Sequence, residues 1–304
     1  MKRESATVYG FPESIDAAGG LADALQWPLS EVSLNHFPDG ESLVRIDTQN
    51  DIAVVYRSLN QPNGKLVELM LAASALREGG ARRLVLVAPY LCYMRQDIAF
   101  HLGEAVSQKV VGQFLDGIFD VIVTVDPHLH RTERLSEVFP SSDAVSLSAS
   151  SLFAAQLRAD GIGKDTILVG PDSESRQWVE AVARPLGLEV LIGEKTRQGD
   201  RAVDIEISGP ERVSGRPVVI IDDVVSTGGT LTQCAKILAN SDAATIEVLA
   251  VHALWRAEDE ARLRAAGITR LRSTDSIPHA SNAMNLAPLI AEAFQAGPFY
   301  KVFT

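Results

Sequence analysis

The sequence predicts an α/β protein with two similar domains, each built on a doubly wound parallel sheet. Short runs rich in Val, Ile and Leu alternate with longer amphipathic segments along nearly the whole chain, which is typical of sheets that helices bury on both faces. The chain has 304 residues, more than a single hydrophobic core usually serves. A serine-rich stretch at 139–151 breaks the pattern near the middle and is the predicted domain boundary.

Eight short segments are predicted to be strands, and several of them are rich in Val, Ile and Leu without alternation, as strands buried on both faces are. In chain order they are residues 52–57, 84–89, 121–125, 166–170, 189–192, 217–222, 247–250 and 269–272. Apolar side chains recur at helical spacing within 65–77, and two glycines follow where a helix C-terminus favours them. A last apolar helix is predicted at 285–296. We assign residues 1–143 and 144–304 to the two domains, with packing of 285–304 on the first domain as the alternative.

Composition limits the kind of ligand. The chain has 28 Lys and Arg against 39 Asp and Glu, a net charge of -11. A nucleic-acid track is therefore not expected, and a phosphate ligand needs local cations or backbone amides. Cys92 and Cys234 lack metal or CxxC spacing, which favours free thiols in a reducing compartment. With no signal-like N-terminus and no run of about eighteen apolar residues, we expect a cytoplasmic protein that does not enter a membrane.

The stretch "IIDDVVSTGGTL" at 220–231 is the most informative motif. Two acids end a predicted strand, and a helix opens with hydroxyls and glycines whose amides can hold a phosphate. Adjacent strand residues point to opposite faces, so the two acids are expected to serve different partners. The alternative is an ordinary helix start capped by Ser or Thr. The residues concerned are Asp222, Asp223, Ser226, Thr227, Gly228, Gly229 and Thr230.

This stretch resembles the ribose 5-phosphate (PRPP) loop shared by phosphoribosyltransferases and phosphoribosyl pyrophosphate synthetases. The resemblance implies that the loop amides and hydroxyls hold the 5-phosphate and that Asp222 and Asp223 hold ribose hydroxyls. Ser226 stands where synthetases commonly have Asp, so this loop alone does not choose between the two groups. The resemblance also implies two domains of the phosphoribosyltransferase type.

Two N-terminal segments are similar to the nucleotide site of the synthetases. "FPDGE" at 37–41 and "PYLCYMRQD" at 89–97 match segments that bind ATP in that family. The alternatives are a polar Pro-Asp-Gly turn and an arginine with a structural role, although its planar fork suits phosphate oxygens. The residues that the resemblance assigns to ATP here are Phe37, Asp39, Gly40, Glu41, Arg95, Gln96 and Asp97.

Three further segments match the synthetases in the same order. "VTVDPHLH" implies that His128 contacts Mg²⁺ or an ATP phosphate, and "GPDSES" implies that Asp172 is a second magnesium-linked residue. "GEKTRQGDRAVDIEI" at 193–207 is similar to the flexible catalytic loop, with Lys195 and Arg197 as its mobile cations. The alternatives are a hydrogen-bonded histidine and a solvated basic loop. "GEAVSQK" and the KTR form resemble the archaeal-type branch of the family.

The resemblance implies a ribose-phosphate diphosphokinase for nucleotide biosynthesis. Such an enzyme transfers the diphosphoryl group of ATP to the C1 hydroxyl of ribose 5-phosphate, with Mg²⁺ as cofactor, and gives PRPP and AMP. The first domain would bind ATP and the second ribose 5-phosphate. The family also implies a homo-oligomer, a dimer or larger.

Two alternative functions predict different sequence features. A phosphoribosyltransferase predicts a single α/β domain and neither FPDGE nor RQD. A catalytically silent regulatory paralogue is disfavoured because Lys195, Arg197 and His128 are present.

Overall fold

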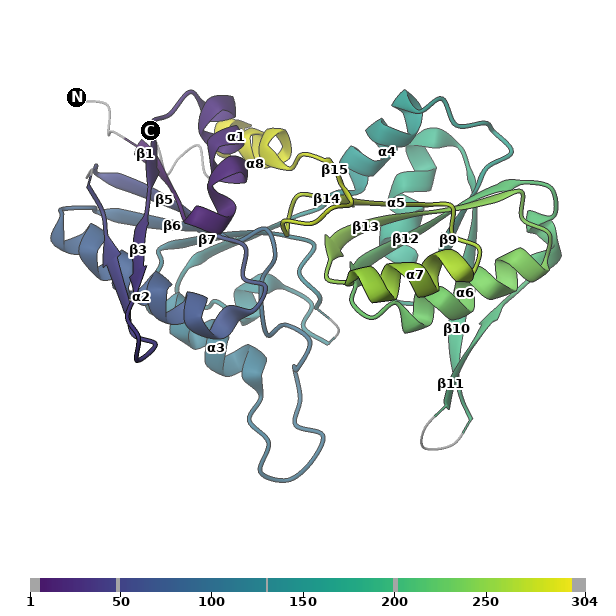
Figure 1. Cartoon of the computed structure of the whole chain (residues 1–304), viewed down its shortest axis with the longest axis horizontal. Helices are drawn as coiled ribbons and strands as arrows, with labels where there is room; N and C mark the ends of the chain where they lie inside the picture. The colour runs from purple at the N-terminus through teal and green to yellow at the C-terminus, as the bar shows by residue number, and fades with distance from the viewer. Residues whose placement is uncertain (1–5, 48–49, 130, 199–201, 297–304) are drawn as a thin grey trace. The chain divides into compact units, whose positions relative to one another are not determined.

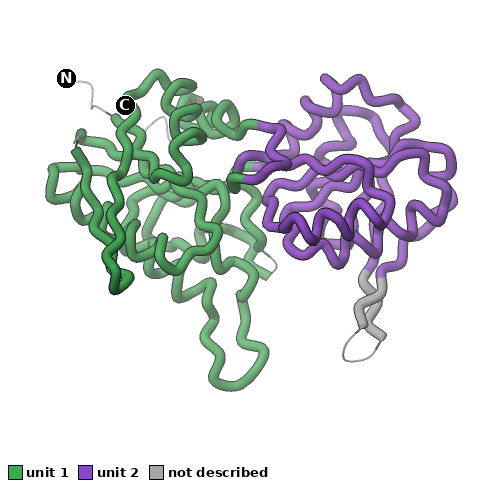
Figure 2. The backbone as a smooth tube through the Cα atoms, in the orientation of Figure 1, with its two compact units in different colours: residues 1–147, 276–278, 285–304 green, residues 148–275, 279–284 purple. Residues whose placement is uncertain are grey.

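The computed structural model describes residues 6–47, 50–129, 131–198 and 202–296, which form two compact α/β units (Figures 1 and 2). Unit 1 comprises residues 1–147, 276–278 and 285–304, and unit 2 comprises 148–275 and 279–284. The predicted α/β fold with two parallel-sheet domains is confirmed. Unit 1 ends its first segment at Leu147, because residues 143–147 form the edge strand of its sheet.

Unit 1 contains a six-stranded sheet in the order β2-β1-β5-β6-β7-β8, and all neighbours are parallel. Helices cover both faces, α1 and α8 on one side and α2 and α3 on the other (Figure 1). The inner strands β5 and β7 are therefore buried along their whole length. The strands are β1 (Ala6–Gly10), β2 (Leu29–Glu31), β5 (Ile52–Tyr56), β6 (Arg83–Val87), β7 (Val121–Val125) and β8 (Asp143–Leu147); the helices are α1 (Ile15–Leu25), α2 (Pro62–Glu78), α3 (Ser107–Asp116) and α8 (Ala287–Ala296).

The last of the described helices, α8, belongs to unit 1. The rings of Phe294 on α8 and Trp27 lie edge to face, with centroids 5.8 Å apart. Gln295 Nε2 donates a hydrogen bond to the carbonyl of Ala24 on α1 at 3.3 Å. The C-terminal helix therefore completes the core next to the N-terminal one.

A separate antiparallel hairpin of β3 (Ser33–His36) and β4 (Ser42–Arg45) also lies in unit 1. Leu34, Val44 and Ile46 pack it against the hydrophobic core. The sequence prediction had no strands here, because both are short and largely exposed.

Unit 2 has a seven-stranded sheet in the order β11-β10-β9-β12-β13-β14-β15, parallel except for the antiparallel pair β10 and β11. Helices α4 and α5 cover one face and α6 and α7 the other (Figure 1). The strands are β9 (Ile167–Gly170), β10 (Glu189–Gln198), β11 (Ala202–Ile207), β12 (Pro217–Val225), β13 (Thr245–Ala253), β14 (Arg270–Thr274) and β15 (Asn282–Met284); the helices are α4 (Ser150–Ala159), α5 (Arg176–Leu186), α6 (Gly229–Asn240) and α7 (Ala257–Ala265). Short 3₁₀ helices are found at Pro12–Ser14, Leu135–Glu137 and Pro210–Val213.

Cys92 and Cys234 are free and buried. None of the described helices combines the length and the apolar character that a membrane span requires.

Candidate active site

A glycine-rich loop joins β12 to α6 and has the geometry of an anion-binding turn. Gly228 adopts a left-handed conformation, with φ at +70°, directly before α6 begins at Gly229. A Cβ added at Gly228 would lie 2.8 Å from Cδ2 of Leu263 on α7. Glycine is therefore required at this position by both the backbone angle and the close approach of α7.

The start of α6 is not capped by a side chain. Gly228 is the N-cap residue, so no side-chain cap hydrogen bond forms. The first four N–H groups of a helix have no acceptor within the helix, and they point outward with a partial positive charge. An ordinary helix start capped by Ser or Thr is thus not what the structure has at α6, and these amides are suited to an external anion.

Acidic side chains gather at the carboxyl ends of β9 and β12, which are neighbours in the sheet. Strand β12 continues to Val225, so Asp222 and Asp223 lie within it rather than at its predicted end. Asp223 and, just after β9, Asp172 are buried. Burial raises the pKa of the Cys234 thiol on α6, and the negative charges of Asp222 and Asp172 raise it further. Acids from two strands therefore share one neighbourhood beside α6.

The turn after β9 is built around Asp172. Its Oδ1 accepts hydrogen bonds from the backbone N–H groups of Glu174 at 3.1 Å and Ser175 at 3.2 Å. Ser175 Oγ donates to the Asp172 carbonyl at 2.6 Å. A Cβ at Gly170 would lie only 2.4 Å from this Oγ. Ser175, which is buried, is thus an integral part of the turn that orients Asp172.

The segment predicted to be a flexible catalytic loop is largely strand. Residues 193–198 continue β10, and residues 202–207 form β11. The side chains of Lys195 and Arg197 lie outside the described residues, so their catalytic assignment stays a prediction. Within unit 2, the structure brings together the predicted ribose 5-phosphate loop and Asp172.

In unit 1, FPDGE forms the turn that joins β3 to β4. The N–H of Phe37 donates to the carbonyl of Glu41 at 2.8 Å, and that of Gly40 donates to the carbonyl of Phe37 at 2.9 Å. Gly40 has φ at +92°, and Asp39 Oδ1 accepts the N–H of Glu41 at 3.1 Å. The expected turn with glycine at its bend is present, and it leaves Phe37 exposed at 43 %. An exposed aromatic ring on a defined turn can stack on a planar ligand.

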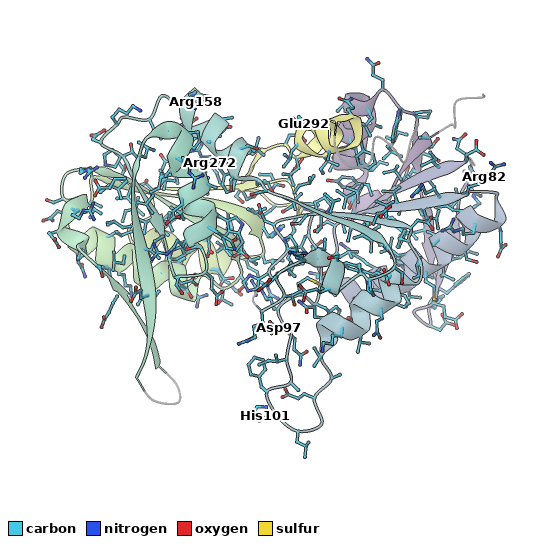
Figure 3. All side chains as sticks on the ribbon, turned by 180° about the vertical axis from the view of Figure 1, so that it is seen from behind. Arg82, Asp97, His101, Arg158, Arg272 and Glu292 are labelled. Atoms are coloured by element: carbon cyan, nitrogen blue, oxygen red, sulfur yellow. The ribbon has the colours of Figure 1, made fainter. Side chains whose placement is uncertain are left out.

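The RQD segment follows β6, and its three residues differ in environment. Arg95 is exposed, while Gln96 is half-buried and bonded to the Ser107 hydroxyl. Asp97 is buried at the base of a long loop, far from His101 at its outer end (Figure 3). Its Oδ1 pairs with Arg131 Nη1 at 2.8 Å, and its Oδ2 accepts the Arg131 N–H at 3.1 Å. Asp97 therefore joins this loop to the one after β7, a structural role that the sequence did not reveal.

His128 is half-buried on the loop after β7, next in the sheet to β6. Asp126, before it, is a buried residue with φ at +36°. Because β6 and β7 are parallel neighbours, their following loops share one edge of the sheet. His128 belongs to unit 1 and Asp172 to unit 2, and their joint action on one ion stays a prediction.

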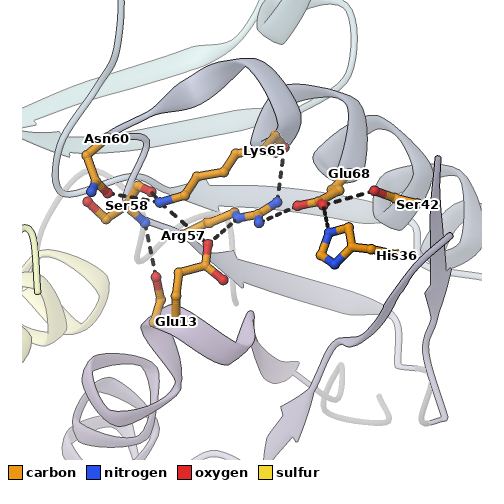
Figure 4. A network of polar contacts seen from close by, with 9 residues as sticks. Glu13, His36, Ser42, Arg57, Ser58, Asn60, Lys65 and Glu68 are labelled. Atoms are coloured by element: carbon orange, nitrogen blue, oxygen red, sulfur yellow. Dashed lines mark hydrogen bonds and ion pairs between the residues drawn. The ribbon is translucent and has the colours of Figure 1, made fainter. Parts of the chain in front are cut away.

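A polar network centred on the buried residues Arg57 and Glu68, beside the FPDGE hairpin, was not predicted from the sequence (Figure 4). Arg57, the residue directly after β5, donates from Nε to Glu13 Oε1 at 2.8 Å and from Nη2 to Glu68 Oε2. Glu68 also accepts bonds from His36 and Ser42. The sequence feature that could have revealed this network is Glu68, a charged residue that lies one helical turn before Ala72 on the buried face of α2.

The chain has two α/β units with largely parallel sheets, and in one of them a strand that carries acids leads into a glycine-rich, anion-binding turn. These features define a protein of the phosphoribosyltransferase fold class. The family models agree: "N-terminal domain of ribose phosphate pyrophosphokinase" matches residues 8–118, and "Phosphoribosyl transferase domain" matches residues 147–286. The chain belongs to the ribose-phosphate pyrophosphokinase family, as the sequence resemblance predicted.

Several relatives share nearly the full length of the chain. A ribose-phosphate pyrophosphokinase of Methanopyrus kandleri is 33% identical over 93% of this chain and 96% of its own length. One of Methanothermobacter thermautotrophicus is 32% identical over 95% and 99%. The crystal structure of phosphoribosylpyrophosphate synthetase from Mycobacterium smegmatis superposes with a TM-score of 0.84 at 24% identity, covering 96% of this chain and 98% of that one. This likeness shows the shared fold.

Proposed function

We propose that this chain is a ribose-phosphate diphosphokinase that makes PRPP and AMP from ribose 5-phosphate and ATP. The observation that carries the proposal is the uncapped, glycine-led start of α6 beside buried acids, in a member of this family. A phosphoribosyltransferase is disfavoured, because the chain contains a second α/β unit that matches the N-terminal synthetase domain.

Ribose 5-phosphate is assigned to unit 2. The amides at the start of α6, with the Ser226, Thr227 and Thr230 hydroxyls, would hold the 5-phosphate. Asp222 and Asp223 would accept hydrogen bonds from ribose hydroxyls, since a carboxylate accepts strongly and cannot share a site with a phosphate without repulsion. The separation of donors on the helix from acceptors on the strand supports this division of roles.

ATP is assigned to unit 1. The exposed Phe37 ring would stack on adenine. The Asp39 and Glu41 carboxylates, on either side of the bend at Gly40, would lie near the polar edge of the adenine ring. Arg95 is exposed and makes no ion pair among the described residues, so its guanidinium is available for phosphate oxygens. Gln96 and His128 complete the predicted nucleotide site. Asp97, predicted to bind ATP as well, is buried and paired with Arg131, so it would support the site by holding this loop.

Magnesium is proposed as the cofactor, and the donors present fit it. Among the described residues there is no group of three or more His, Cys, Asp and Glu side chains placed to hold a metal. Mg²⁺ commonly needs only one or two protein ligands, because phosphate oxygens and water supply the others. Asp172 offers such a carboxylate, while His128 would act best through a bound water. When bound, Mg²⁺ would neutralise phosphate charge.

The transfer itself requires positioning rather than a protein nucleophile. The C1 hydroxyl oxygen of the sugar would form a bond to the β-phosphorus of ATP and release its proton to water. The bond from that phosphorus to the oxygen of the α-phosphate would break, and AMP would leave. Lys195 and Arg197 are proposed to stabilise the negative charge that the diphosphoryl group carries during transfer.

A homo-oligomer, a dimer or larger, is proposed because the adenine segment acts across a subunit contact in the family. The free, buried cysteines support the expectation of a reducing, cytoplasmic compartment. No nucleic acid or membrane partner is proposed.

The decisive experiment is incubation with Mg²⁺, ATP and ribose 5-phosphate, followed by detection of AMP and PRPP. We expect AMP to form only when the sugar is present. AMP without the sugar would indicate ATP hydrolysis and contradict the proposal. No turnover at all would favour a catalytically silent regulatory paralogue.

A further inference from the structure

The FPDGE turn joins the two strands of the β3–β4 hairpin, and the carboxylate of Glu68 binds both residues that flank this turn. His36 is the last residue of β3 and Ser42 the first of β4, and the two are paired across the hairpin. His36 Nε2 lies 2.8 Å from Glu68 Oε1, and Ser42 Oγ donates to the same oxygen at 3.0 Å. The residues on either side of FPDGE are therefore tied to a single atom of α2 (Figure 4).

The Glu68 carboxylate is itself held in place by Arg57. The Glu68 side chain is 6% exposed, and its Oε2 accepts a hydrogen bond from Arg57 Nη2. Arg57 is held in turn by Glu13 Oε1 at 2.8 Å and by the Lys65 carbonyl at 3.1 Å. Its guanidinium carbon lies 3.8 Å from the centre of the Phe11 ring. Glu68 thus has one oxygen anchored in the core and the other directed to the hairpin.

The charge state of Glu68 agrees with this arrangement. Burial raises its pKa, but hydrogen bonds from His36, Arg57 and Ser42, with the charge of Arg57, bring it below its ordinary value. The carboxylate is therefore ionised at neutral pH and remains an acceptor for both hairpin residues.

The hairpin needs such an anchor. A two-stranded hairpin is marginally stable by itself in water, and its apolar contacts with the core come from Leu34, Val44 and Ile46. The side chains beside the turn make polar contacts instead. If these polar contacts are lost, the turn can sample other conformations. The apparent affinity for the nucleotide is then reduced in proportion to the fraction of molecules whose turn has the binding conformation.

We propose that Glu68, anchored by Arg57, is a positioning residue that holds the nucleotide-binding turn in its binding conformation through His36 and Ser42. The proposal rests on the proposed function in one respect, the assignment of residues 37–41 to ATP. Glu68 lies on α2 and acts on the turn only through His36 and Ser42.

The test removes the hairpin contacts and leaves the buried pair intact. In the variant His36→Ala/Ser42→Ala we expect the dissociation constant of Mg·ATP, measured by calorimetry without sugar, to rise about tenfold. The KM for ATP should rise equally, while kcat and the KM for ribose 5-phosphate stay within about twofold. His36→Gln keeps a donor and should restore most of the affinity. Asn35→Ala is the matched control, because Asn35 is an exposed neighbour that points to the opposite face.

Unchanged ATP affinity in the double variant would overturn the proposal. Phe37→Ala then separates the causes: weaker ATP binding in Phe37→Ala leaves the assignment of the turn intact, whereas unchanged binding removes that assignment too. Equal losses for both substrates, or no rescue by His36→Gln, would reduce the network to a general structural role and also refute the inference. Because ATP binding is measured directly, a failure to form PRPP bears on the proposed function alone.

Discussion

Replacing Gly228 with alanine tests the geometry of the phosphate loop. A side chain in the left-handed conformation costs about 1–2 kcal/mol, and Gly228 has φ at +70°. The added Cβ would also meet Leu263 Cδ2 at 2.8 Å. Leu263 is fully buried, so it has little room to move, and overpacking of this kind costs about 1–3 kcal/mol. The free energy of unfolding should therefore fall by about 2–5 kcal/mol.

Gly215 provides the matched control. It has the same φ of +70°, yet a Cβ there would have no atom within 4 Å. Gly215→Ala should therefore lose only the conformational part, about 1–2 kcal/mol. Urea unfolding of both variants gives the difference, which isolates the contact with Leu263.

Gly228→Ala should also change the KM for ribose 5-phosphate, because the clash with Leu263 can be relieved by a shift of the start of α6. If the start of α6 moves away from α7, the amides lose their alignment, and a loss of about 2 kcal/mol in binding corresponds to roughly a 30-fold higher KM for ribose 5-phosphate. Gly215→Ala should leave that KM unchanged. Equal destabilisation by the two variants would refute the packing argument, and an unaltered KM in Gly228→Ala would refute the assignment of the loop.

Three further predictions concern catalysis and pH. Lys195→Ala should lower kcat by about 100-fold or more with little change in the KM for ribose 5-phosphate; unchanged steady-state turnover would remove Lys195 from the catalytic group. Asp222→Ala should raise the KM for ribose 5-phosphate, and an effect confined to ATP would contradict its ribose role. Burial raises the pKa of Glu13 and Glu68, but their hydrogen bonds and the charge of Arg57 bring both below the ordinary 4.5. Their contribution to stability is therefore complete above about pH 4.5 and is lost as the pH falls through the lower folded values, so urea midpoints should decline below pH 4.5 in the native chain and less in Arg57→Met.

The core of the fold was predictable because buried parallel strands have a distinctive composition. All eight predicted segments overlap observed strands, from β5 to β14. Among the strands that sequence reasoning missed, β2, β15 and the β3–β4 hairpin are short, at an edge or exposed. It also missed β8, a five-residue edge strand, and β1, a five-residue inner strand that is largely buried. A run of three or four residues with one solvent-facing side does not produce a recognisable apolar pattern.

Strand β11 was missed for another reason. Val203, Ile205 and Ile207 alternate with acids, which is the pattern of a half-buried strand. The similarity of this segment to a catalytic loop favoured a loop instead. Ile205 and Ile207 are buried in the core of unit 2, so local alternation was here the better guide to backbone structure.

The candidate site divides in the same way. The loop at 226–230 could be predicted because its chemistry is local: glycines, hydroxyls and a helix start follow one another in the sequence. The network of Arg57 and Glu68 could not, because its members come from four separate segments and meet only when the strands and α2 are assembled. A glutamate on the buried face of a helix requires a partner, since a buried charge without one is strongly destabilising. The sequence therefore implies that some cation approaches Glu68, but only the fold identifies it as Arg57 and directs the second oxygen to the FPDGE hairpin.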